Sequence, residues 1–221
     1  MGMVRVFALL KIMSLRAFLI LACLLAAGPL AADSQLDDME LVQALRAGGY
    51  SIYFRHVSTD WSQSDDVREV DDWRSCDPLR MRQLSAAGRE AARAIGVAMR
   101  RLDIPVAEVL ASPYCRTVET AKLMGMGKVS ESTKVMNLRS ADYFGGRASI
   151  VASAQGLLAS PPPSGSNRVI VAHGNVAREA TPAYPGEGEA LVFLADAAGG
   201  FSLRGRIRPS DWTRLIELAS E

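Results

Sequence analysis

Short apolar segments that alternate with helical ones constrain the fold of this chain more than any other feature of its sequence. Three of them, Tyr50–Phe54, Val106–Ala111 and Arg168–Ala172, are brief and rich in β-branched or aromatic residues, which predicts strands. Between them lie segments with helical spacing, the strongest of which runs from the predicted N-cap Ser85 to about Arg101. This alternation predicts an α/β fold of three layers, α/β/α, around a largely parallel central sheet.

The other predicted elements complete this pattern. Two polar segments, 57–79 and 128–148, follow no period and are expected to be irregular. The remaining expected elements are a helix over Leu36–Ala47, a helix from Ser112-Pro113 to Gly125, a weak helix over Ser149–Leu158, a hairpin of Ala190–Ala195 and Phe201–Ile207, and a last helix from Ser210-Asp211 to Leu218.

The first 32 residues have the character of a leader. Three basic residues precede an apolar run over Ala17–Ala27, and small residues follow up to Ala32, a pattern typical of a secretory signal peptide. We expect cleavage after Ala32, which leaves 33–221 as a single exported domain, periplasmic or secreted. Two alternatives rank below cleavage: a retained membrane anchor, which the shortness of the run disfavours, and lipidation at Cys23.

The composition of the mature chain limits its partners. The formal net charge is +1 for the whole chain, and loss of the three basic leader residues lowers it to −2. No basic block remains, so we expect no nucleic-acid partner, and no later segment predicts membrane insertion. Two cysteines remain, Cys76 and Cys115, and an even pair in an oxidising compartment predicts a disulfide, with two isolated thiols as the alternative.

Polar residues gather where the three predicted strands end. The first strand is followed by Arg55 and His56, the second by a helix whose first turn holds Arg116, and the third by His173. Ligands in such folds bind beyond the carboxyl ends of the strands, so these side chains are expected to meet. His56 and His173 are the two histidines of the whole chain.

Arg116 indicates what kind of ligand this edge binds. A helix N-terminus already carries partial positive charge, so an arginine there is unfavourable unless an anion lies between them. Arg55 would add a second fork of donors, which suits a tetrahedral anion. Each residue alone has an ordinary structural explanation, and two histidines could be metal ligands, but no carboxylate or thiol stands at ligand spacing beside them.

Three motifs at these positions resemble those of the histidine phosphatase superfamily, also called phosphoglycerate-mutase-like. The first matches Arg-His-Gly-x-Thr except that Val57 replaces the glycine, and the resemblance extends over roughly 50–195. The matching segments are Phe54–Thr59, Arg82–Gly88 with Ser112–Ala121, and Val169–Gly174.

The resemblance implies a phosphoglycerate-mutase-like fold and a phosphatase that needs neither metal nor cofactor. His56 would be phosphorylated on a ring nitrogen, Arg55 and Arg116 would bind the phosphoryl oxygens, and His173 would donate to the same oxygens. Thr59 would help to bind the substrate, a small phosphorylated compound. The implied chemistry is nucleophilic catalysis, in which one difficult displacement is divided into two.

The acid that protonates the leaving oxygen in this family has no counterpart in the expected places. In one branch it is a Glu near the position of Ser140, and in the other an Asp at the position of Gly174. Of the acids that remain, Asp142 is preferred over Asp60 and Glu189. This departure keeps two other functions open: a non-catalytic protein that binds a phosphate ligand, and a phosphotransferase or mutase acting on an envelope component.

Overall fold

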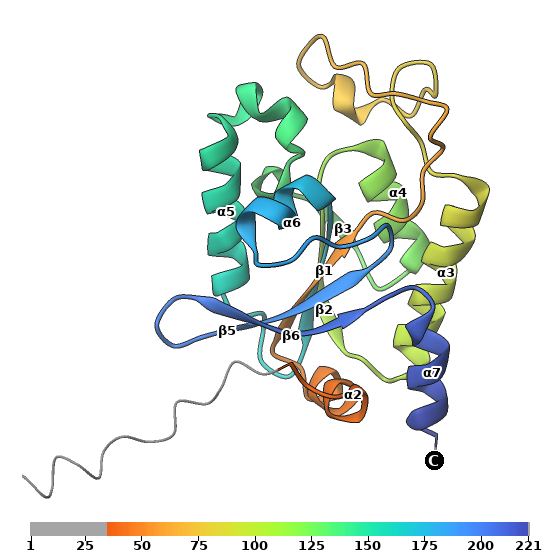
Figure 1. Ribbon diagram of the computed structural model, residues 1–221, viewed down its shortest axis with the longest axis vertical. Helices are drawn as coiled ribbons and strands as arrows, with labels where there is room; N and C mark the ends of the chain where they lie inside the picture. Colours follow the sequence, from red (N-terminus) through yellow and green to blue (C-terminus); the bar gives the residue numbers. More distant parts are fainter. Residues whose placement is uncertain (1–34, 221) are drawn as a thin grey trace, which may run out of the picture. The chain divides into compact units, whose positions relative to one another are not determined.

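A six-stranded sheet in the order β3-β2-β4-β1-β5-β6 organises the protein (Figure 1). The computed structural model describes residues 35–220, so the predicted signal peptide and Cys23 lie outside the described residues. The first four strands in that order pair in parallel, and the last two continue the sheet as an antiparallel hairpin. The strands are β1 (Tyr50–Arg55), β2 (Val106–Ala111), β3 (Val129–Glu131), β4 (Asn167–Ala172), β5 (Ala190–Ala195) and β6 (Phe201–Ile207).

Helices cover both faces of the sheet, which confirms the three-layer α/β/α prediction (Figure 1). Successive residues of β4 point to opposite faces: Val169 and Val171 join one hydrophobic core, and Ile170 and Ala172 join the other. The first core includes residues of α2 (Asp38–Ala47), α3 (Ala86–Arg101), α4 (Cys115–Met124) and α7 (Asp211–Leu218). The second includes residues of α5 (Arg147–Ala159) and α6 (Gly174–Ala180), and of the 3₁₀ helices η1 (Asp72–Arg74), η2 (Thr133–Val135) and η3 (Leu138–Phe144).

The parallel register brings three strand ends to one edge. Arg55 at the end of β1 pairs with Ala172 of β4, and Ala111 at the end of β2 pairs with Val171. The residues that follow these strands therefore emerge side by side, as the sequence predicted. No helix of the described residues has both the length and the apolar character needed to cross a membrane.

The N-terminus of α3 packs closely against the segment that follows β1. Ser85 caps this helix by accepting a bond from the backbone N–H of Gly88, as predicted. The carbonyl oxygen of Ser58 accepts bonds from both the backbone and the side chain of Ser85. A Cβ at Gly88 would lie 2.1 Å from that carbonyl oxygen, so glycine is the residue that permits this contact.

Three local predictions differ from the structure. The helix expected to start at Ser112-Pro113 begins at Cys115 with Tyr114 as its N-cap, because the Ser112 hydroxyl lies within hydrogen-bond distance of His173 instead. The segment 128–148, expected to be irregular, contains β3, η2 and η3, and the short helix α6 was also missed. These elements are three to seven residues long, too short to show a period.

Cys76 and Cys115 form a disulfide, with 5.4 Å between their Cα atoms. This confirms the predicted bridge. The bond joins the long segment after β1 to the first residue of α4, directly before Arg116. The segment after β1 is thus covalently attached to α4, the helix that carries Arg116.

We expect reduction of this disulfide to lower the stability of the protein. The bridge closes a loop of 39 residues, and the chain-entropy estimate for a loop of that size is about 4 kcal/mol. Urea unfolding of the protein with and without reductant measures the difference. A Cys76→Ser/Cys115→Ser variant, which reductant should not affect, is the control, and an unchanged unfolding free energy of the wild type would contradict the prediction.

Candidate active site

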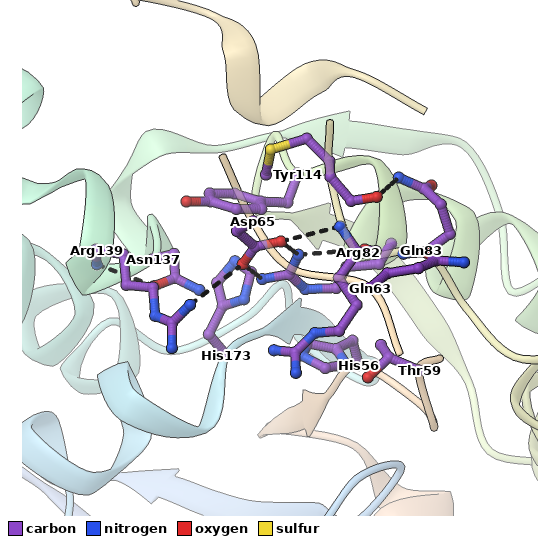
Figure 2. Close-up of polar contacts among 12 residues, drawn as sticks. His56, Thr59, Gln63, Asp65, Arg82, Gln83, Tyr114, Asn137, Arg139 and His173 are labelled. Carbon is purple, nitrogen blue, oxygen red and sulfur yellow. Dashed lines mark hydrogen bonds and ion pairs between the residues drawn. The ribbon is translucent and has the colours of Figure 1, made fainter. Parts of the chain in front are cut away.

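A cavity of about 170 Å³ lies at the edge of the sheet where β1, β2 and β4 end. Four of its lining residues are the predicted Arg55, His56, Arg116 and His173, which the structure thus brings together. Figure 2 shows the polar contacts around it. The other lining residues are Trp61, Asp65, Arg82, Asn137, Arg139, Gly174, Asn175 and Tyr184.

His56 is held in one tautomer. Its Nδ1 lies 3.0 Å from the carbonyl oxygen of Val57, which can only accept, so Nδ1 carries the hydrogen and Nε2 carries the lone pair. Burial, followed by the charge of Arg116, holds the pKa of His56 well below its usual value. The ring is therefore neutral near pH 7, which is the form that can act as a nucleophile.

Val57, the departure from the family motif, does not disturb this arrangement. Its side chain is buried in the hydrophobic core with residues of α3 and β5, and it does not line the cavity. The extra side chain thus packs away from the site.

His173 faces His56, with 5.7 Å between the ring centroids. Its Nε2 lies 2.9 Å from the Ser112 hydroxyl, and Tyr53 fixes its backbone on both sides through one hydroxyl group. Burial, then the charge of Arg116, lowers the pKa of His173 well below its usual value. The ring is also neutral near pH 7, and its Nδ1 can donate to a ligand once the Ser112 hydroxyl donates to Nε2.

Four arginines, Arg55, Arg82, Arg116 and Arg139, surround the two rings. The Arg116 side chain is 2% exposed and its guanidinium stacks 4.6 Å from the ring of Tyr114. Arg82 stacks over the exposed Trp61 at the opening, 4.2 Å from the ring, and burial followed by the charge of Arg116 lowers its pKa. The cavity is therefore strongly positive, as an anion site requires.

Unpartnered polar atoms concentrate at this cavity. Within residues 35–220, seven buried side-chain nitrogen or oxygen atoms have no hydrogen-bond partner, and four of them belong to its lining. They are Nε of Arg82, Nε of Arg116, Nδ1 of His173 and Oδ1 of Asn175. A buried polar group without a partner costs about 1–3 kcal/mol, so the three nitrogens are suited to donate to the oxygens of a bound anion, whereas the amide oxygen of Asn175 can only accept.

Asp65 is a site residue that the sequence did not predict. Its two carboxylate oxygens accept from Nη1 and Nη2 of Arg116 at 2.8 and 3.0 Å, and its side chain is 2% exposed. The backbone N–H of Arg82 and the more distant guanidinium of Arg139, at 3.9 Å, complete its contacts (Figure 2). The sequence predicted an anion at Arg116, and in this structure the side-chain carboxylate of Asp65 takes that place.

Two predicted site residues do not line the cavity. Thr59 is buried and donates to Glu187 at 3.0 Å, and Glu187 in turn pairs with Arg55 at 3.5 Å. Thr59 is therefore connected to the cavity residue Arg55 through Glu187. Asp142, the preferred acid, is exposed on η3. The structure therefore does not bring Asp142 into the cavity.

The other two candidate acids also lie elsewhere. Asp60 bonds to Ser62 and Gln63, and Glu189 is buried against Arg206 at 2.8 Å. At the place of the family's glutamate, Ser140 is buried and shares a hydrogen bond of 2.7 Å with the hydroxyl of Tyr114. No group of three or more His, Cys, Asp or Glu side chains in the described residues is arranged to hold a metal ion.

One comparison with known protein families gave a match. The family model described as "Histidine phosphatase superfamily (branch 1)" matches residues 52–145. A comparison with curated protein sequences gave no match.

Several solved structures are similar to this one. The protein histidine phosphatase SixA, complexed with tungstate, is similar with a TM-score of 0.51 and 15% identity, over 73% of this chain and 98% of that one. A mycobacterial glucosyl-3-phosphoglycerate phosphatase has a TM-score of 0.49 and 19% identity, over 71% and 97% of the two chains. A phosphoserine phosphatase from Entamoeba histolytica has a TM-score of 0.49 and 14% identity, over 72% and 96%.

The matched segment contains Arg55, His56, Arg82 and Arg116, four of the residues that line the cavity. Over this segment the chain is thus similar to the histidine phosphatase superfamily, and its fold is similar to that of a protein histidine phosphatase.

Proposed function

We propose that this protein is a metal-independent phosphatase that hydrolyses a small phosphorylated compound through a phosphohistidine formed on His56. The observation that carries the proposal is the combination of a neutral His56, whose Nε2 lone pair is available, with unpartnered donors in the same cavity. The independence from metal rests on the chemistry that the family resemblance implies.

The proposed reaction uses these groups in two displacements. Nε2 of His56 attacks phosphorus and the leaving oxygen departs, and water then attacks the phosphohistidine and releases inorganic phosphate. Arg55, Arg82 and Arg116 stabilise the charge that spreads over the phosphoryl oxygens, together with His173 as a neutral donor. The carbonyl of Val57 holds the His56 ring in position through both steps.

The compartment is part of the proposal. We infer that the protein is exported after removal of residues 1–32 and works in the periplasm or outside the cell. The disulfide between Cys76 and Cys115 supports this inference, because such bonds persist in oxidising compartments.

A second candidate function is a protein that binds a phosphate ligand without turnover. Two observations favour it: Ser140 stands where the family's acid is expected, and Asp65 already neutralises Arg116. This candidate predicts phosphate binding without formation of a phosphohistidine, so the next experiment separates the two.

We expect His56→Ala to abolish hydrolysis of p-nitrophenyl phosphate, because the variant has no nucleophile. The wild type, quenched in turnover with labelled substrate, should retain a phosphate label that base leaves intact and acid removes. His173→Asn keeps the nucleophile and should still take up label, at a lower rate. A fully active His56→Ala variant, or a label that resists acid, would rule out this mechanism.

We expect Arg55→Ala and Arg82→Ala each to weaken the binding of inorganic phosphate or vanadate by about tenfold or more. The reason is that a charge-assisted hydrogen bond contributes about 1.5–3 kcal/mol. Titration calorimetry on the purified mature protein measures this. Arg80→Ala is the matched control, because Arg80 is exposed, pairs with Asp72 and does not line the cavity. Equal affinity in the wild type and the three variants would mean that the anion binds elsewhere.

We expect the free energy of unfolding to fall as the pH is lowered from about 6.5 to 5. The pKa values of His56 and His173 are lowered in the folded protein, so over this range the unfolded chain binds protons that the folded chain does not. Each histidine then contributes a slope that rises from about 0.7 kcal/mol per pH unit at pH 6.5 to about 1.4 near pH 5. Urea unfolding at several pH values measures the slope, and His173→Asn should reduce it. A stability that does not depend on pH in this range would contradict the lowered pKa values.

A further inference from the structure

We propose that Asp65 is the general acid that protonates the leaving oxygen and the general base that later activates water. This inference rests on the proposed phosphatase function and deepens it. Asp65 is the one carboxyl among the described residues that line the cavity of His56. The acids considered from the sequence, Asp60, Asp142 and Glu189, all have their side chains elsewhere.

The contacts of Asp65 place its carboxyl on the group that would bind the phosphoryl oxygens. Both of its oxygens lie within 3.0 Å of the terminal nitrogens of Arg116, and Arg116 shares the cavity with His56 and His173. A phosphoryl group bound to Arg116 therefore comes within the immediate surroundings of Asp65. Proton transfer needs this proximity before it needs a suitable proton affinity.

The substrate itself can supply the proton that Asp65 donates. A phosphate monoester and the Asp65 carboxylate would share the guanidinium of Arg116, so the two groups would lie close enough for a proton to pass between them. The proton can arrive on the ester, whose second pKa is about 6. Asp65 would then hold a neutral carboxyl beside the reacting group, while Arg116 turns its charge toward the phosphoryl oxygens.

The segment that carries Asp65 is fixed well enough for this role. The backbone N–H groups of Asp60 and Asp66 donate to the carbonyls of Gln83 and Arg80, so the segment pairs with the chain before α3. Between them, the side chain of Gln63 accepts from the backbone of Gln83 at 2.9 Å. The Cys76–Cys115 bridge joins the same region to α4. A catalytic carboxyl on an irregular segment requires this kind of support.

Two displacements make up the proposed reaction. The lone pair of His56 Nε2 forms the nitrogen–phosphorus bond while the bond from phosphorus to the leaving oxygen breaks, and that oxygen keeps the electron pair and takes the proton of Asp65. In the second displacement, the Asp65 carboxylate takes a proton from water as the water oxygen bonds to phosphorus. The electron pair of the nitrogen–phosphorus bond returns to Nε2, and the protonated Asp65 is restored.

The test compares substrates with good and poor leaving groups. We expect Asp65→Asn to lower kcat/KM toward an alkyl phosphate by about 10²–10⁴-fold, the usual contribution of a general acid. Toward p-nitrophenyl phosphate, whose leaving group needs little protonation, the loss should stay below about tenfold. Because kcat/KM reports the steps up to departure of the leaving group, slow hydrolysis of the phosphohistidine does not disturb the comparison.

Two variants serve as controls. Glu187→Gln removes the other carboxyl that pairs with a cavity arginine, Arg55, and should lower both activities by the same factor. Asp142→Asn changes an exposed carboxyl outside the cavity and should change neither. Partial unfolding of a variant scales both substrates alike, so the ratio of the two kcat/KM values remains informative.

The outcomes are distinct. An equal loss of both activities in Asp65→Asn would mean that Asp65 only positions Arg116, and higher activity or tighter phosphate binding would mean that it only blocks the site; either overturns the proposal. The wild type alone also gives a test. A steep dependence of kcat/KM on the pKa of the leaving group would show that no acid takes part, and would overturn the proposal. A wild type that hydrolyses neither substrate, or activity that survives in His56→Ala, would instead refute the proposed phosphatase itself.

Discussion

The buried charge of Arg116 is the constraint on which the rest of the site depends. An arginine with 2% of its side chain exposed needs compensation, because a buried cation without a partner is strongly destabilising. The structure supplies this compensation through the carboxylate of Asp65 and the face of the Tyr114 ring. Arg116 also heads the charged groups that lower the pKa of both histidines. This cation thus adds to the effect of burial in keeping both rings neutral.

Much of the fold and part of the site could be predicted because they depend on local pattern. The strands β1, β2 and β4 are short apolar segments, and the parallel pairing of such strands places whatever follows them at one edge. Arg55, His56, Arg116 and His173 all follow or adjoin a strand end in this way. The Ser85 cap and the Cys76–Cys115 bridge were predictable for similar reasons, since each rests on residue type and context rather than on distant contacts.

The rest of the site depends on contacts between distant parts of the chain. Asp65 lies in a polar segment with several other acids, and nothing in its spacing separates it from Asp60 or Asp66. It reaches Arg116, 51 positions later, because hydrogen bonds to the chain before α3 and a disulfide bring the segment there. Asp142 was preferred because of its position in the family pattern, but η3 turns its side chain to solvent. The start of α4 was misplaced for a comparable reason, since the Ser112 hydroxyl serves His173, a residue 61 positions away.

The disulfide also bears on when the site becomes complete. The bridge attaches the segment after β1, which carries Asp65, to α4, which carries Arg116. Its second cysteine, Cys115, directly precedes Arg116 in the chain. If the bond forms only after export, the newly made chain in a reducing cytosol lacks the covalent tie between these two halves of the cavity. Oxidation would then act as a step of maturation, and phosphorylated metabolites inside the cell would meet only the immature form. A compartment boundary, rather than a dedicated inhibitor, would keep the activity apart from cytosolic substrates.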